Sequence, residues 1–245
     1  MKLKRMIVQA LALIGLASLV VGGLWLWRQR PWRTAVSVNG HVLTAQELDF
    51  RALTHLNDDR RVGRPVKNME SYRRLSAKKW IVKEVLLSEA IARGIEVGAE
   101  DEKKGLDDMA RVLKSRKLTP EDFFKEGPIP EARKRQDFRE GLLINKFTTK
   151  EVREKIKLTT KEIDEYQEAL KAQATVEKKM KGKTDVKFDR KTAITQMHAE
   201  RFQRGFRQLF RTLYKKADVR VPEFPDLERV DAVSPPRPED KEMKK

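Results

Sequence analysis

Few side chains in this sequence of 245 residues have the types and spacing that catalysis or metal binding requires. The chain has no cysteine, which excludes thiol catalysis, disulfides and cysteine-ligated zinc. His41, His55 and His198 lie too far apart in sequence to place two metal ligands on one helical face. No serine nucleophile elbow or phosphate-binding glycine loop occurs. We therefore predict a protein without enzyme activity, metal site or cofactor.

Phenylalanines are the side chains best suited to a function, because apolar surface bordered by charge can hold apolar segments of another polypeptide. The alternative is that amphipathic helices bury these rings against each other as ordinary core. Seven phenylalanines fall on predicted helices and are the candidates for binding another chain: Phe123, Phe124, Phe138, Phe147, Phe202, Phe206 and Phe210.

Positive charge is the second feature, with a formal net charge of +17 and no acidic residue before Glu47. This charge would attract anionic lipid or acidic protein segments. The alternative is that it belongs only to the solvated surface of basic helices. Arginines and lysines concentrate on one side of the last predicted helix and its aromatics on the other. A nucleic-acid site usually places aromatics within the basic face, so we do not expect nucleic acid as a partner.

The apolar stretch Met6–Trp27 carries no charge and is long enough to cross the roughly 30 Å hydrocarbon layer as a helix. A cleaved signal peptide is the alternative, since Gly15-Leu16-Ala17 has a small-x-small form, but the apolar run continues beyond it. We predict a retained signal-anchor over residues 1–33, with its tip in the cytoplasm. The predicted membrane-interface residues are Trp25, Trp27, Arg28, Arg30, Trp32 and Arg33.

A small β-hairpin is predicted directly after the anchor. Apolar residues alternate from Ala35 to Leu43 around Asn39-Gly40, the dipeptide that favours a type I′ turn. Thr44 and Glu47 have the spacing of a capping box, so a helix should begin at once.

Helical periodicity then dominates the chain up to Lys216, which predicts a mainly α fold. Capping signals place helix starts at Thr119 and Thr159, and Gly94 has the position of a C-cap glycine. We expect the helix that starts at Thr159 to fray after about Ala174 into a flexible link. The expected helical domain spans residues 34–221, in lobes 34–175 and 186–221.

Residues Asp218–Val221 have the alternation of a short strand. Since a lone strand is not stable, we predict that it pairs with the hairpin at the other end of the domain. The segment 222–245 holds five of the ten prolines and is predicted to be a disordered tail.

This order of elements resembles the SurA-like chaperone module of SurA, PrsA and the membrane-anchored PpiD. The resemblance covers Thr34 to Val221 and rests on "VSVNG", "LTAQELD", "EAIARGIEV", "LTPEDFF", "FREGLLINKF", "LTTKEIDEY" and the closing helix and strand. In that family the two ends of the module join into one client-binding domain. The resemblance implies a holdase that binds unfolded or partly folded exported proteins on the periplasmic side of the inner membrane.

One departure from the family is large. A parvulin-type prolyl isomerase domain commonly precedes the closing helix, whereas the segment available here is too short to fold as that domain. The resemblance therefore implies chaperone binding without isomerase chemistry. Its implied partners are unfolded exported polypeptides and the membrane, with anionic lipid or a translocation complex as further partners. The alternative function is a membrane-anchored scaffold that docks one specific partner through its basic helical body.

Overall fold

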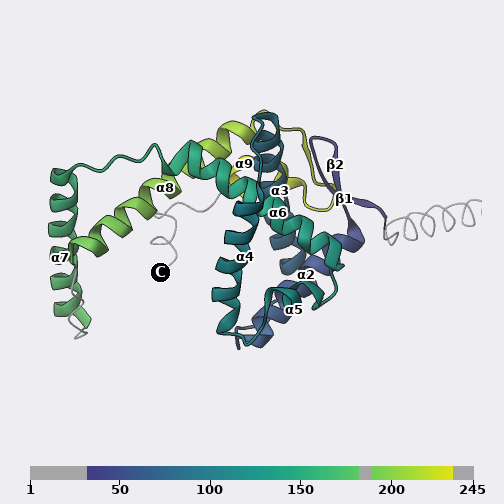
Figure 1. Cartoon of the computed structure of the whole chain (residues 1–245), viewed down its shortest axis with the longest axis horizontal. Helices are drawn as coiled ribbons and strands as arrows, with labels where there is room; N and C mark the ends of the chain where they lie inside the picture. The colour runs from purple at the N-terminus through teal and green to yellow at the C-terminus, as the bar shows by residue number, and fades with distance from the viewer. Residues whose placement is uncertain (1–31, 182–188, 234–245) are drawn as a thin grey trace, which may run out of the picture.

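The computed structural model describes residues 32–181 and 189–233 of the chain, with side chains for 32–172 and 189–233. It is mainly helical and carries a small antiparallel sheet, which confirms the predicted fold class (Figure 1). Met6–Trp27 and the segment 234–245 lie outside the described residues. Within the described ranges, none of the helices combines the length and the apolar character that crossing a membrane requires.

The sheet joins the two ends of the domain. Strands β1 (Thr34–Val38) and β2 (His41–Thr44) form the hairpin, and β3 (Val219–Arg220) pairs with the other edge of β1 in the order β2-β1-β3. Asn39 and Gly40 have φ angles of 50° and 84°, as a type I′ turn requires. The Asn39 amide donates to the Asp218 carbonyl, and Asn39 Oδ1 accepts from the Asp218 amide. The predicted pairing of the Asp218–Val221 strand with the hairpin is confirmed, with β3 shorter than predicted.

Two long helices follow the hairpin. Helix α2 (Ala45–Arg61) begins at Thr44, whose hydroxyl accepts a hydrogen bond from the Glu47 amide. Helix α3 (Met69–Ala92) runs through the middle of the molecule and ends before Gly94, which has a φ of 64°. The apolar face of α3 packs under the sheet, and Trp80 is 3% exposed in this core. Trp80 is therefore a core residue, as its helical spacing indicated.

Helices α4 (Ala99–Lys114), α5 (Pro120–Lys125) and α6 (Glu131–Thr148) follow (Figure 1). Helix α6 packs on α3, and α4 and α5 pack on α6 and on each other. The chain continues from α6 as a π-helix, η1 (Thr149–Arg153). Helix α8 (Arg190–Tyr214) crosses η1 at Gly205, where an added Cβ would lie 2.7 Å from Cγ1 of Val152. This close approach requires a glycine and brings α8 onto the core.

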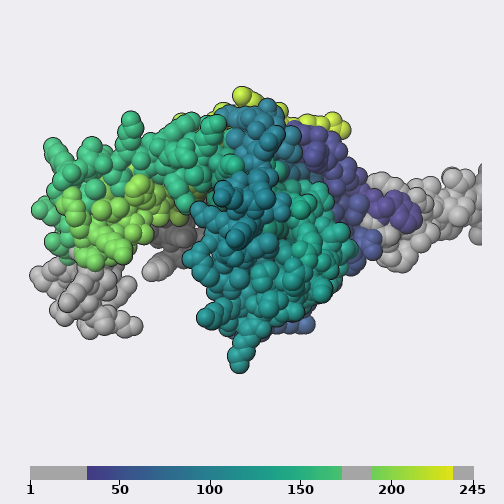
Figure 2. All heavy atoms as spheres, in the orientation of Figure 1, coloured from purple at the N-terminus to yellow at the C-terminus, as the bar shows by residue number. Residues whose placement is uncertain are grey.

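An arm projects from this body. Helix α7 (Thr160–Lys181) packs mainly against the first half of α8 (Arg190–Tyr214), and the second half of α8 enters the core (Figures 1 and 2). Arg201 of α8 donates to Glu162 of α7 at 2.6 Å, while the Thr159 and Glu162 capping box closes the start of α7. Helix α7 continues past the fraying point predicted near Ala174. The rest of the predicted link, residues 182–188, lies outside the described ranges.

The prediction that the segment from Pro222 onward is disordered is wrong for residues 222–233. These residues form a short 3-10 helix, η2 (Pro225–Glu228), and a helical turn, α9 (Val230–Val233), which fold back on the body. Their apolar side chains are buried in the main core because they recur at every third position, the period of a 3-10 turn. The core residues of this stretch are Val221, Phe224, Leu227 and Val233, with Val230 packed against them.

Candidate binding groove

A groove with a cavity of about 360 Å³ lies between α2, α4, α5 and α6. Thr54 of α2 and Met109 of α4 both line it. We call it the binding groove. Its apolar lining consists of Met109, Phe123, Pro128, Ile129 and Phe138, and its charged residues are Asp58, Arg61, Arg116, Glu126, Lys134 and Asp137.

The short helix α5 carries two adjacent aromatic rings. One lines the groove, and the other is buried behind it. A capping box closes its first turn, because the Thr119 hydroxyl accepts from the Asp122 amide while Asp122 accepts from the Thr119 amide. Phe124 is 1% exposed and contacts Phe138 edge to face, with ring centroids 5.8 Å apart. Phe123, the preceding residue, is only half-buried and lines the groove.

The loop Gly127–Pro130 forms one end of the groove. Gly127 has a φ of 85°, a conformation that favours glycine, and turns the chain out of α5. Lys134 in the first turns of α6 then reaches back, and its Nζ donates to the Phe123 carbonyl at 2.9 Å. This bond also places the Lys134 ammonium 5.5 Å from the centre of the Phe123 ring. The apolar lining is thus bordered by charge.

Helix α4 forms a thinly packed wall. Leu113 is its one buried residue, and Val112 is 68% exposed. At Gly105 the helix approaches α6 so closely that an added Cβ would lie 2.7 Å from Leu142 and 3.0 Å from Phe138. The wall therefore buries little side-chain surface apart from Leu113 and this close approach.

A cluster of charges at the groove joins α2, α3 and α6. Asp137 accepts from Lys83 Nζ at 2.5 Å and from Arg51 Nη2 at 3.0 Å. Burial by itself raises the pKa of Asp137, but the attraction of Arg51 and the hydrogen bond from Lys83 outweigh it and lower the pKa below its ordinary value. Asp137 is thus ionised at neutral pH and links α2 and α3 to α6 at the groove.

The structure separates the seven candidate phenylalanines into three groups. Phe123 and Phe138 line the binding groove. Phe202 and Phe206 stack on each other on α8, with centroids 6.0 Å apart and each ring half-buried. The remaining three are buried and have no surface for a partner in this structure, because they pack into the body as core residues: Phe124, Phe147 and Phe210.

Three residues of the apolar lining were not among the sequence candidates, namely Met109, Pro128 and Ile129. The signal for Met109 is the apolar spacing Leu106, Met109 and Leu113 on α4. Pro128 and Ile129 belong to the "GPIP" break, whose position between two helices is visible in the sequence. The sequence does not predict which face of α4 lies next to the Gly127–Pro130 loop, because tertiary packing decides it.

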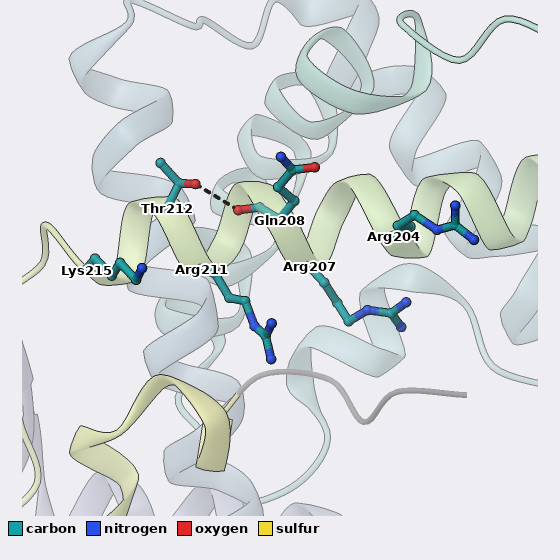
Figure 3. A pocket seen from close by; sticks show the side chains of 6 residues that line it. All are labelled: Arg204, Arg207, Gln208, Arg211, Thr212 and Lys215. Atoms are coloured by element: carbon teal, nitrogen blue, oxygen red, sulfur yellow. Dashed lines mark hydrogen bonds between the residues drawn. The ribbon is translucent and has the colours of Figure 1, made fainter. Parts of the chain in front are cut away.

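A second concave surface lies on α8 (Figure 3). Its cavity of about 280 Å³ is lined by Arg204, Arg207, Gln208, Arg211, Thr212 and Lys215. Arg207 and Arg211 extend to the same side of the helix (Figure 3), and Arg211 donates to Asp231 of α9 at 3.1 Å. We call this surface the basic groove. It carries the positive charge that the sequence placed on one side of the last helix.

Of the six predicted membrane-interface residues, only Trp32 and Arg33 are described. Trp32 is 68% exposed. Arg33 forms an ion pair with Glu223, which also pairs with Arg73 of α3 at 2.7 Å. Arg33 therefore connects the start of the domain to its C-terminal segment. Trp25, Trp27, Arg28 and Arg30 lie outside the described residues.

No group of three or more potential metal ligands occurs within residues 32–181 and 189–233. No family model matches the chain, and no curated protein matches it.

Proposed function

We propose that the protein is a membrane-anchored holdase that binds unfolded or partly folded exported polypeptides without catalysing a reaction. The observation that carries this proposal is the binding groove, in which Met109, Ile129 and two phenylalanines lie open to a ligand and charges surround them. Such a lining binds short apolar segments of many sequences and remains soluble when empty. The thin packing of α4 supports the proposal, because a wall with one buried residue can adjust to different side chains.

The anchor, the periplasmic location and membership of the SurA-like module belong to this proposal. The apolar stretch Met6–Trp27 supports an anchor, and the absence of acidic residues before Glu47 suits an anionic membrane surface. The pairing of both domain ends in one sheet is the arrangement that the SurA-like module implies.

The test asks whether the full chain, held in lipid nanodiscs, suppresses the aggregation of an unfolded exported protein. Aggregation is measured by light scattering. Met109→Glu places a charge in the groove and should abolish suppression, since an apolar ligand would have to desolvate the carboxylate. Val112→Glu on the same helix is the matched control, because Val112 is exposed and does not line the groove. If Met109→Glu protects as well as the original chain, the groove is not the client site. If the original chain gives no protection, the holdase proposal falls.

The basic groove favours a second function, a scaffold that docks one acidic partner. Four of its six residues are cationic side chains on successive turns of α8. Docking through these charges should weaken steeply between low and high salt, whereas apolar binding should not. Protection that survives high salt and is insensitive to Arg204→Gln supports the holdase. Binding of a single partner that is lost in salt supports the scaffold.

A further inference from the structure

Two ion pairs join helix α2 to the chain on either side of helix α5. Arg61, the last residue of α2, pairs with Glu126, which directly follows α5. Asp58 pairs with Arg116 in the connection between α4 and α5, where Asp58 Oδ1 and Arg116 Nη1 are 3.9 Å apart. All four residues line the binding groove. We call the two ion pairs the charge latch.

The two pairs fix one arrangement of α5 against α2. Asp58 and Arg61 are three residues apart on α2, so their side chains lie on the same side of the helix with opposite charges. Their partners flank α5 with the signs reversed, since the cation Arg116 precedes the helix and the acid Glu126 follows it. A displacement of α5 along α2 would therefore weaken both pairs.

The main apolar packing of these helices is made with other partners. Helix α2 packs mainly on α3, whereas α4 and α5 pack on α6 and on each other. Phe124 fixes α5 on Phe138 of α6. The charge latch thus adds a link between α2 and α5 that depends on charge.

The charges of the latch are open to water, because each of the four side chains is 40–47% exposed. Met109, Phe123 and Phe138 in the same groove are half-buried. The latch therefore lies at the solvent-exposed edge of the groove. Ion pairs in such positions are weak and are screened by salt, so they open at a small cost in free energy.

We propose that the charge latch gates the binding groove. While both pairs are formed, the latch holds α5 close to α2 and restricts entry, and a client enters when the pairs open. The inference rests on the proposed holdase function and adds its regulation. Salt opens such a gate, and so does a charged residue of the client that replaces one partner of a pair. A closed gate keeps the apolar lining away from other apolar surfaces when no client is bound.

The first test measures opening of the groove without a client. The chain has no cysteine, so Met109→Cys places a single thiol in the groove of the full chain in nanodiscs. The rate of its reaction with a bulky neutral maleimide reports access to the groove. Arg61→Glu should raise this rate about fivefold, because it replaces an attraction with a repulsion. High salt should raise the rate of the Met109→Cys chain as well, and should have much less effect once Arg61→Glu is present.

Two variants control for other effects of the charge reversal. The swap of Arg61→Glu with Glu126→Arg rebuilds the pair with its signs exchanged, and it should return the labelling rate to that of Met109→Cys alone. This rescue separates a lost ion pair from a damaged fold. Arg60→Glu is the matched control, because it makes the same charge change at an exposed neighbouring residue that does not line the groove. It should leave the labelling rate unchanged.

The second test measures binding of a labelled apolar peptide by fluorescence anisotropy, in chains that keep Met109. The fraction of open grooves sets the apparent affinity, so Arg61→Glu should tighten binding by about the same factor as it speeds labelling. The charge swap should restore the original affinity. Empty nanodiscs control for binding of the peptide to lipid.

The two tests separate the latch from the holdase function. A labelling rate that Arg61→Glu does not change, or that the swap does not restore, overturns the latch whether or not a peptide binds. Faster labelling with unchanged peptide affinity overturns the gating of clients. If no variant binds the peptide, the holdase function fails, and the labelling rates alone decide the latch.

Discussion

Leu227→Ala tests whether the C-terminal segment is a structural part of the core. Leu227 is fully buried in η2, and its carbonyl accepts from the buried Tyr214 hydroxyl at 2.6 Å. The substitution removes three carbon atoms from a buried side chain, which costs about 2.4 kcal/mol at about 0.8 kcal/mol per carbon. An unfilled cavity raises the cost toward about 5 kcal/mol. A disordered tail would give a change near zero.

The measurement is thermal unfolding of the full chain in mild detergent, followed by far-UV circular dichroism. For a domain of this size a loss of about 2.5 kcal/mol lowers Tm by roughly 5–10 °C. Val112→Ala is the control, because it shortens an exposed apolar side chain and should change stability by less than about 0.5 kcal/mol. A Leu227→Ala variant as stable as the Val112→Ala variant would refute the packing of residues 222–233 on the core.

Three further predictions concern stability and are read from urea unfolding. Gly205→Ala should destabilise the chain, because the added methyl group overpacks against Val152 at a cost of about 1–3 kcal/mol. Alanine gains only roughly 0.5–1 kcal/mol over glycine in a helix. A more stable variant would show that η1 moves to accommodate the methyl group. Asp137→Asn should cost about 1–3 kcal/mol at neutral pH, because the Arg51 and Lys83 cations lose their shared carboxylate. Because the pKa of Asp137 is lowered in the fold, that cost should persist down to its ordinary value of 3.8 and disappear as the pH falls further; an unchanged cost in strong acid would contradict this. Burial raises the pKa of Glu84 above its ordinary 4.5, so its protonated form favours folding and this contribution is lost as the pH rises through the folded pKa. Glu84→Gln should therefore stabilise the chain at neutral pH and match it below about pH 4.5, and a destabilised variant at pH 7 would refute this sign.

Local signals in the sequence predict the elements whose geometry is decided by neighbouring residues. Asn39-Gly40 predicts the hairpin turn because only that turn type needs two positive φ angles. Thr119 and Thr159 predict helix starts because their hydroxyls satisfy backbone N–H groups within three residues. The pairing of β3 with β1 followed from a different argument, that an isolated strand leaves its backbone unpaired.

Tertiary packing decides the rest. The prolines after Pro222 suggested disorder, yet the apolar residues at every third position of that stretch find a partner surface on α3 and α8. Phe123 and Phe124 are adjacent and of one type, so the sequence could not separate the groove residue from the buried one. A cavity of about 240 Å³ beside the binding groove joins residues of α2, α3 and one loop, and no local spacing in the sequence connects them.

The central position of β1 has a consequence for synthesis of the chain. Asn39 and Asp218, which close the sheet, are 179 positions apart. At about 5–20 residues per second, the ribosome needs on the order of 10–40 s to make the second after the first. During that time β1 has one free edge, and an unpaired strand edge is a template for pairing with other chains. The nascent protein therefore passes through an aggregation-prone stage that ends only when its last strand emerges.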